Sequence, residues 1–357
     1  MKILLLSKYD KLGASSRVRS LQYIPYLEKE GIFVFVSSLF NNNYLDILYK
    51  KGKKSLYCAF IGYIKRLYQL LFLRKYDLIW IEKEIFPMLP PFLESIFKNL
   101  NIPYIVDYDD AVFHNYDLNK NILIRAMYKK KIDIVMKKSR AVIVGNKYLA
   151  NRAFNAGAKK VYILPSSVDL NKYIIKSYKP DDNIFKIGWI GTPKTFNYLN
   201  IIIDVLEQFT KKYKSKVIAI GGDKKSKLGE VPIEIREWRA SSEVDDIYGI
   251  DVGIMPLIDG PWERGKCGYK LIQYMACCKP VIGSPIGVNK EIIKNGENGY
   301  KPKNKQEWFK YLEILYMSKD LRIDMGKKGR KIVEKKYSLQ ENLPKLIGIL
   351  KESRLND

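Results

Sequence analysis

The sequence predicts an α/β protein with two parallel, doubly wound sheets, one in each half of the chain. Short apolar runs alternate with longer amphipathic stretches, a pattern typical of parallel strands that helices cover on both faces. The whole pattern then restarts in the second half. A chain of 357 residues is too long for one ordinary core and suits two domains.

Each strand is expected at one of these apolar runs. Six fall in the first half: Ile3–Leu6, Phe33–Val36, Leu78–Ile81, Tyr104–Val106, Val142–Val144 and Val161–Leu164. Five fall in the second half: Phe185–Ile190, Val217–Ile220, Ile233–Glu237, Val252–Met255 and Val281–Gly283. Ligands of such sheets bind beyond the carboxyl ends of the strands, so functional residues are expected in the loops that follow them.

A segment rich in Ser, Lys, Asp and Pro, Pro165–Asn183, separates the halves and indicates a linker. We therefore expect an N-terminal domain at residues 1–167, a linker at 168–183 and a C-terminal domain at 184–336. A helical, basic tail at 337–357 can pack back toward the N-terminal domain. The two domains are expected to face each other across a cleft.

Composition limits the class of protein. The start, MKILLLSKYD, matches neither a signal peptide nor a membrane span, which predicts a cytoplasmic protein, soluble or peripheral. The four cysteines have no metal-ligand spacing and there is one histidine, so no metal site is expected. The net charge of +25 leaves two interpretations open, a basic surface for anionic lipid or phosphorylated substrates and a compositional bias toward lysine.

Residues 45–76 concentrate positive charge among aromatic and leucine side chains. The segment is too charged to span a bilayer, and a basic, aromatic-rich amphipathic helix suits an anionic membrane surface. The alternative is a surface helix that packs its apolar side on the sheet. A second basic cluster in the same half comprises Lys129, Lys130, Lys131, Lys137 and Lys138.

Two loops in the first half are candidate sites. The loop after the first strand, Lys11–Arg17, contains Gly13, Ser16 and Arg17, and small residues before a helix allow close approach of a ligand, with Arg17 and Arg19 as charges for phosphate. The alternative is a tight turn with a serine N-cap.

Three carboxylates, those of Asp107, Asp109 and Asp110, follow the fourth strand. Such a cluster is costly unless it binds a cation, hydrogen-bond donors or hydroxyls, and the alternative is that Asp109 or Asp110 caps the next helix. His114 follows closely.

The second half offers two helix starts for anion binding. In the first, a strand leads into Gly191, Thr192 as N-cap and Pro193, with Lys194 adding a point charge. In the second, the loop Gly265–Lys270 combines glycines with two lysines before an apolar helix at 271–278. A diphosphate is the expected ligand of this loop. The stretch that ends at Asn289 is expected to close the site.

These motifs, in this order, resemble the retaining glycosyltransferases of family 4 (group 1), which have two Rossmann-like domains in the GT-B arrangement. The resemblance covers nearly the whole chain and rests on Ser16–Arg19, Asp109–Ala111, Gly145–Ala150, Gly188–Gly191, Tyr269–Ala276 and Gly326–Tyr337.

The resemblance implies a nucleotide-sugar donor held mainly by the second half and an acceptor held mainly by the first. Many members carry two glutamates eight positions apart around the glycine-rich loop, where this chain has Gly265 and Gln273. Gln273 retains hydrogen-bonding capacity for ribose hydroxyls, and Glu263 is the nearest carboxylate for the donor sugar. Thr192 stands at the family's arginine and Asp109 at its histidine. The implied donor site comprises Gly191, Thr192, Lys194, Glu263, Lys266, Gly268, Tyr269, Lys270, Gln273 and Asn289.

The implied reaction transfers a hexose-type sugar with retention, without metal or cofactor, to a saccharide or lipid-linked saccharide in surface polysaccharide or lipopolysaccharide synthesis. Asp109, Asp110 and Lys270 are the expected catalytic residues, and the expected acceptor site comprises Gly13, Ser16, Arg17, Asp107 and His114. Two alternatives are a nucleotide-sugar epimerase of GT-B shape and an inactive GT-B partner protein. A nucleic-acid binder is disfavoured because no recognised motif accompanies the charge.

Overall fold

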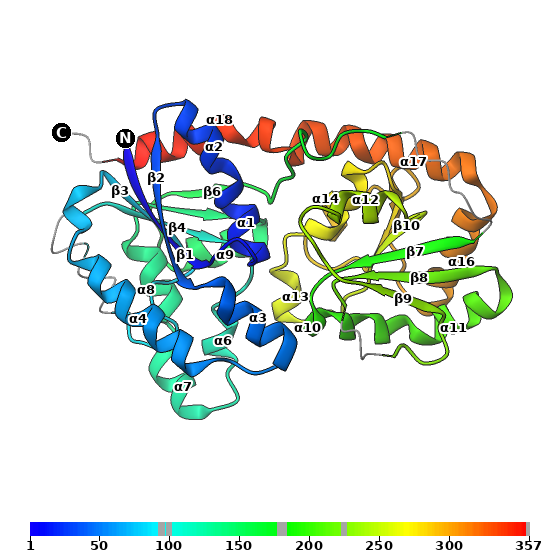
Figure 1. Ribbon diagram of the computed structural model, residues 1–357, viewed down its shortest axis with the longest axis horizontal. Helices are drawn as coiled ribbons and strands as arrows, with labels where there is room; N and C mark the ends of the chain where they lie inside the picture. Colours follow the sequence, from blue (N-terminus) through cyan, green and yellow to red (C-terminus); the bar gives the residue numbers. More distant parts are fainter. Residues whose placement is uncertain (92–96, 98–101, 177–183, 223–226, 355–357) are drawn as a thin grey trace. The chain divides into compact units, whose positions relative to one another are not determined.

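The computed structural model describes residues 1–91, 97, 102–176, 184–222 and 227–354. Within them the strands form two six-stranded sheets in which all neighbouring strands are parallel (Figure 1). All the predicted strands are present, and the fold class is confirmed. The sequence analysis missed one strand, β12 (Gly299–Tyr300), which is only two residues long and gives no period-2 signal.

The chain divides into two compact units. Unit 1 contains Met1–Ser166, Arg264–Cys267 and the stretch from Asn342 onward. Unit 2 contains Ser167–Glu263 and Gly268–Glu341. A short piece of the second half of the sequence thus belongs with the first half, and so does the end of the chain.

The sheet of unit 1 has the strand order β2-β1-β3-β4-β5-β6. Its strands are β1 (Lys2–Tyr9), β2 (Phe33–Phe40), β3 (Leu78–Glu82), β4 (Tyr104–Tyr108), β5 (Ala141–Val144) and β6 (Val161–Ile163). The central strands β3 and β4 are buried along their whole length, which explains why their sequences are nearly continuous apolar runs rather than alternating ones.

The helical segments of unit 1 connect and cover these strands. They are α1 (Ala14–Arg19), η1 (Leu21–Tyr23), α2 (Ile24–Lys29), α3 (Asn42–Lys51), α4 (Leu56–Leu70), η2 (Leu73–Lys75), α6 (His114–Asp117), α7 (Ile122–Tyr128), α8 (Lys131–Lys138) and α9 (Lys147–Asn155). The basic segment at 45–76 is therefore two helices rather than one. They are separated by Gly52, whose φ of 66° ends α3 in the left-handed conformation that glycine adopts at low cost.

The sheet of unit 2 has the order β12-β11-β10-β7-β8-β9. Its other strands are β7 (Phe185–Ile190), β8 (Ser215–Ile220), β9 (Ile233–Arg236), β10 (Val252–Met255) and β11 (Val281–Gly283). Alternate residues of β8 enter different cores, Ile218 and Ile220 on one face and Val217 and Ala219 on the other. Both faces of this sheet are therefore covered, as a doubly wound sheet requires.

The helical segments of unit 2 include the predicted helix start at Pro193, which is confirmed. They are α10 (Pro193–Phe196), η3 (Asn197–Ile202), α11 (Ile203–Lys212), α12 (Glu243–Tyr248), α13 (Pro261–Arg264), α14 (Tyr269–Ala276), α15 (Asn289–Ile292), α16 (Lys305–Met317), α17 (Lys319–Ile332) and η4 (Val333–Tyr337). The last helix, α18 (Leu339–Ser353), begins in unit 2 and continues in unit 1. The apolar helix predicted at 271–278 begins and ends two residues earlier. No helix in the described ranges is both long and apolar enough to cross a membrane.

Candidate active site

Each sheet has one point at which its strand order reverses, between β1 and β3 in unit 1 and between β7 and β10 in unit 2. At such a point the loops that follow the two strands turn in opposite directions and leave a crevice at the carboxyl ends. In unit 1 these loops begin at Asp10 and Lys83, and in unit 2 at Gly191 and Pro256. Ligand-binding residues are therefore expected in these four loops.

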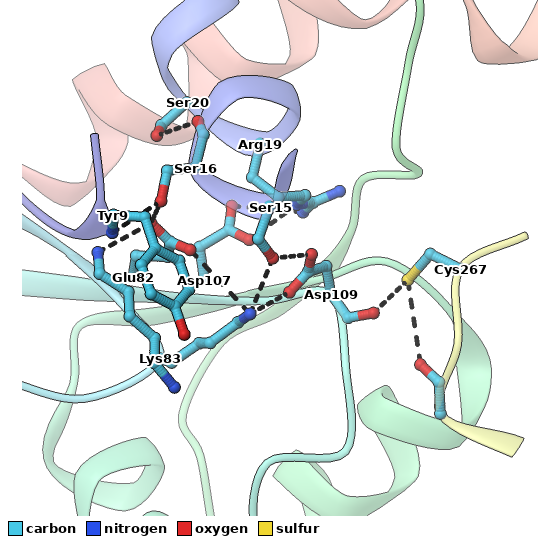
Figure 2. Close-up of polar contacts among 12 residues, drawn as sticks. Tyr9, Ser15, Ser16, Arg19, Ser20, Glu82, Lys83, Asp107, Asp109 and Cys267 are labelled. Carbon is cyan, nitrogen blue, oxygen red and sulfur yellow. Dashed lines mark hydrogen bonds and ion pairs between the residues drawn. The ribbon is translucent and has the colours of Figure 1, made fainter. Parts of the chain in front are cut away.

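Three side chains meet at the reversal point of unit 1 (Figure 2). The Lys83 ammonium, from the end of β3, lies 2.9 Å from the Asp109 carboxylate and donates to the Ser15 hydroxyl at 2.7 Å. Ser15, in the first turn of α1, donates in turn to Asp109. The triangle ties together the loops that follow β1, β3 and β4. The sequence analysis did not name Lys83 or Ser15 as site residues.

Lys83 holds this position in an uncommon backbone conformation. Its φ of 67° lies in the left-handed region, which costs a side-chain-bearing residue about 1–3 kcal/mol. The carboxylates around the ammonium have an electrostatic effect of their own. Burial alone would lower the pKa of Lys83, but Asp109, Glu82 and Asp110 outweigh it and raise the pKa above its ordinary value. Lys83 is a permanent cation in this site.

The same contacts set the charge of Asp109. Burial alone would raise the pKa of its carboxyl, but Lys83 and Ser15 lower it to about 2. Asp110 differs, because burial and the negative charge of Asp109 raise its pKa while Lys266 opposes them. The pKa values of the two adjacent carboxyls are thus shifted in opposite directions. Asp109 stays ionised, whereas Asp110 is better suited to exchange a proton.

Arg19 and Asp107 form a second buried ion pair of unit 1. Arg19 holds Asp107 through two hydrogen bonds of 2.8 and 3.2 Å and donates to the Leu164 carbonyl at 2.7 Å. Both side chains are buried. The expectation that Arg19 supplies charge to a phosphate is therefore wrong, because its guanidinium is committed to an internal carboxylate. Burial raises the pKa of Asp107 to about 6, although Arg19 opposes the shift.

Other predicted acceptor residues also have internal partners. Ser16 is buried, donates to Glu82 and accepts from the backbone N–H of Tyr9. Gly13 is the N-cap of α1, so no side chain caps this helix, and a Cβ added to Gly13 would lie 2.2 Å from the Cβ of Tyr9. Arg17 donates to the Lys11 carbonyl at 3.1 Å. The predicted serine N-cap is absent, and this loop is fixed by β1 and β3.

His114 is held at both ring nitrogens. Its Nδ1 lies 2.7 Å from Asp117 and its Nε2 lies 2.9 Å from the Tyr148 hydroxyl. The N-cap of its helix, α6, is Phe113, so neither Asp109 nor Asp110 caps that helix. The capping alternative for the aspartates does not apply, and the imidazole is engaged inside unit 1.

The piece 264–267 of unit 1 packs directly on the aspartate loop. The Cys267 thiol donates to the Asp109 carbonyl at 3.0 Å, and the Asn146 amide donates to the Gly265 and Lys266 carbonyls at 2.9 and 3.1 Å (Figure 2 shows Cys267 beside Asp109). An added Cβ on Gly265 would lie 2.5 Å from that of Ala111. Only glycine fits here, which explains in physical terms why no carboxylate stands at this position.

At the reversal point of unit 2, β7 leads into a well-formed helix start. Thr192 is the N-cap of α10 and forms a capping box with Thr195. An added Cβ on Gly191 would lie 2.4 Å from the Trp189 ring and 2.7 Å from the Thr195 hydroxyl, so this turn too requires glycine. Lys194 is exposed.

The other predicted donor residues of unit 2 surround the start of α14. Gly268 is its N-cap with a φ of 65°, and Tyr269 and Lys270 form its first turn. The Lys270 ammonium lies 4.1 Å from the centre of the Trp189 ring, a cation–π contact that joins α14 to β7. Asn289 is buried and donates to the Ser284 carbonyl at 3.2 Å.

Two buried polar side chains of unit 2 have aromatic hydroxyl partners. Glu263, in α13, accepts a hydrogen bond from the Tyr198 hydroxyl. Gln273, in α14, is 3% exposed and its amide donates to the Tyr173 hydroxyl at 3.0 Å. These bonds fix both side chains, and the amide oxygen of Gln273 keeps its capacity to accept. Across the described ranges, no cluster of three or more His, Cys, Asp or Glu side chains is arranged to hold a metal ion.

The chain passes from unit 1 to unit 2 within the loop predicted to hold a diphosphate. Lys266 belongs to unit 1, where its charge acts on Asp110, and Lys270 belongs to unit 2. Glu82 is the last residue of β3 and Lys83 directly follows it, and neither was named as a site residue from the sequence. The carboxyl-end rule that selected Asp107–Asp110 applies equally to them and would have found them.

Comparison with known proteins adds two findings. Residues 197–332 match the family model described as glycosyl transferases group 1. This range contains seven of the ten predicted donor residues, from Glu263 to Asn289. A search of curated proteins by sequence finds no match.

Solved structures match the fold over almost the whole chain. Anabaena HepE in complex with UDP-glucose has a TM-score of 0.72 and 15% identity, with 98% of this chain and 99% of that chain covered. Sucrose-phosphate synthase from Thermosynechococcus elongatus has a TM-score of 0.72 and 13% identity, with 99% and 98% covered. A glycosyltransferase from Rickettsia africae has a TM-score of 0.70 and 16% identity, with 99% and 98% covered. The chain thus has the GT-B fold of glycosyltransferase structures, and its residues 197–332 carry the sequence pattern of group 1 glycosyl transferases.

Proposed function

We propose that the chain is a retaining glycosyltransferase of family 4 that moves a hexose-type sugar from a nucleotide-sugar donor to a saccharide or lipid-linked saccharide, in surface polysaccharide or lipopolysaccharide synthesis. The observation that carries this proposal is the group 1 match at 197–332, because that range includes most of the candidate donor residues. The similarity of fold to HepE, solved with UDP and with UDP-glucose, supports a uridine nucleotide as the first donor to test.

The donor diphosphate would bind at the start of α14. The N-terminal end of a helix carries the positive end of its dipole and attracts anions, and Gly268 places no side chain at this end of α14. Lys270, already placed in the first turn, would add a full positive charge. A diphosphate leaves readily once its charge is held, so catalysis can rest on electrostatic stabilisation and positioning. The proposed reaction uses no metal or cofactor.

The two aspartates would have different roles on the acceptor side. Asp109, ionised by its contact with Lys83, is a weak base and is suited to accept hydrogen bonds from sugar hydroxyls. Asp110, whose pKa is raised, is better matched to taking a proton from the acceptor hydroxyl at neutral pH. This division refines the expectation that either carboxylate could serve.

The first experiment identifies the donor. Thermal unfolding is followed in the presence of UDP-, GDP- and other nucleotide sugars, and the best stabiliser is then incubated with saccharide acceptors. We expect one nucleotide class to raise the melting temperature and a product whose anomeric configuration, read by NMR, equals that of the donor. An inverted product would contradict retention. An isomerised donor formed without acceptor would contradict transfer altogether.

The second experiment tests the assigned residues. Lys270→Ala should lower turnover by about a hundredfold, the usual loss for one group that stabilises transition-state charge. The exposed Lys310 in α16 serves as the control, and Lys310→Ala should leave turnover unchanged. Asp109→Asn should bind nucleotide normally but transfer poorly. Full activity of Lys270→Ala, or loss of nucleotide binding in Asp109→Asn, would remove these residues from their proposed roles.

A further inference from the structure

Helix α4 of unit 1 is amphipathic in the reverse of the usual sense. A surface helix normally buries its apolar stripe and exposes its polar face. In α4 the only buried residues are Gly62 and Arg66. Seven large apolar side chains are instead exposed, among them Leu56 at 83% and Phe60 at 65%; the others are Tyr57, Ile61, Ile64, Leu67 and Tyr68.

Polar contacts and close backbone packing hold the inner side of α4. The Arg66 guanidinium donates to the Ser7 carbonyl of β1 at 2.6 Å and to the Ser37 carbonyl of β2 at 2.7 Å. Tyr63 donates to the Pro87 carbonyl at 2.6 Å. An added Cβ on Gly62 would lie 2.0 Å from a carbonyl oxygen of β2, so the helix backbone rests directly on that strand. Arg66 is therefore an internal residue of unit 1 and does not contribute to the exposed positive charge of the segment.

This construction excludes the simpler interpretation of the segment, that its apolar side packs on the sheet. The sheet side of α4 carries Gly62, Arg66 and the half-buried Cys58, Ala59 and Tyr63, whereas the larger aliphatic and aromatic side chains of the helix remain exposed. Figure 1 shows α4 alongside the first sheet. A row of exposed aromatic and aliphatic side chains of this size marks an interaction surface rather than ordinary surface scatter.

The charge around the exposed row selects the partner. Residues 47–76 contain no Asp or Glu. Seven cations of this segment are exposed: Lys50, Lys51, Lys53, Lys54, Lys65, Arg74 and Lys75. Apolar side chains that can enter the acyl boundary, bordered by lysines that contact phosphate headgroups, match an anionic bilayer surface. A protein partner would need an acidic rim around an apolar groove.

A second helix of unit 1 repeats the arrangement on a smaller scale. Helix α7 has no buried residue, and Ile122, Leu123 and Met127 are exposed, followed by exposed Lys129 and Lys130. Lys131, by contrast, is buried on Glu84 and does not belong to this basic cluster. Exposed apolar side chains bordered by exposed lysines therefore occur on two helices of unit 1.

We infer that α4 lies in the interface of an anionic membrane, with its outward apolar row at the acyl boundary and the surrounding lysines on the headgroups. The inference does not depend on the proposed sugar transfer. It goes beyond the charge pattern of the sequence because it assigns the inserting residues and shows that the fold does not need them for its own core.

The test uses sedimentation of the full chain with vesicles of phosphatidylcholine alone or mixed with phosphatidylglycerol. We expect binding to the mixed vesicles at low salt and much weaker binding to phosphatidylcholine alone. Phe60→Asp/Ile64→Asp should reduce binding at least about tenfold. The control Met317→Asp/Ile323→Asp introduces the same charge at exposed apolar positions of unit 2 and should bind like the wild type.

A second double substitution measures how much the lysines contribute to vesicle binding, separately from the apolar side chains. Lys53→Gln/Lys54→Gln should reduce binding roughly 25-fold at low salt, about fivefold for each cation, and the difference should shrink at high salt. Because both lysines are exposed in the α3–α4 connection, this variant also keeps the test decisive if the double aspartate variant fails to fold.

Three results would overturn the inference. The first is a wild-type chain that fails to bind mixed vesicles at low salt. The second is a folded Phe60→Asp/Ile64→Asp variant that binds as tightly as the wild type. The third is a dimer in sedimentation velocity that the same substitutions dissociate, since the row would then be covered by a second copy of the chain.

Discussion

Replacing Lys83 by methionine tests whether Asp109 owes its ionised state to one partner. The two charged groups lie 2.9 Å apart, and only 6% and 14% of their side chains are exposed. Removing one partner of a buried ion pair costs about 3–5 kcal/mol, because the remaining charge stays in a poorly solvated place. Methionine keeps the apolar stem and the unusual backbone position, so the loss reports on the charge.

The assay is calorimetric unfolding at neutral pH. For a unit of this size the loss should lower the melting temperature of unit 1 by on the order of 10 °C. Lys53→Met, at an exposed position, is the matched control and should change it little. The double variant Lys83→Met/Asp109→Asn should recover much of the loss, because it removes both charges. A single variant that melts within about 2 °C of the wild type would refute the reasoning.

The same pair gives a pH dependence of known sign. The pKa of Asp109 falls from 3.8 to about 2 on folding, so the folded state favours the ionised carboxyl. The stabilisation, about 2 kcal/mol, is therefore present above the unfolded value of 3.8 and is lost as the pH falls through about 2. The melting-temperature difference between wild type and Asp109→Asn should shrink over that interval, and a difference that grows with acidification would contradict the assignment.

Three further substitutions test the packing that positions the site. Gly265→Ala should destabilise by about 1–3 kcal/mol because its Cβ would meet Ala111, whereas Gly348→Ala, with open space around it inside α18, should be neutral or stabilising in the same urea titration. Asn146→Ala removes the N-cap of α9 and two hydrogen bonds to the loop at 265–266. It should therefore lower the free energy of unfolding, measured by urea titration, by more than the ~1 kcal/mol of an ordinary cap. A smaller loss would show that the loop does not depend on Asn146. Gly62→Ala should also destabilise, since α4 must move off β2, and an unchanged melting temperature would contradict the close contact.

The fold could be predicted almost completely from the sequence because its signals are local. Buried parallel strands appear as continuous apolar runs, and every run named from the sequence is a strand. Helix ends were less exact, as at α14, where the left-handed Gly268 is the N-cap and the helix begins at Tyr269, two residues before the expected start. The two-residue strand β12 left no pattern to find.

The candidate site was predicted only in part because burial of charge depends on tertiary contacts. Asp109 and Asp110 follow a strand and were found by that rule. Glu82 and Lys83 look like ordinary surface residues in sequence, yet both are buried. Arg19 was assigned to a ligand because a sequence does not show that Asp107, 88 positions away, is its partner.

The way α4 is attached has a consequence for how this protein can change. The residues that fix the helix, Gly62 and Arg66, are not those that it displays. Substitutions along the displayed row therefore leave folding nearly untouched, and evolution or design can retarget that surface without first compensating for a damaged core. The attachment residues have no such freedom, since each is fitted to particular backbone carbonyls.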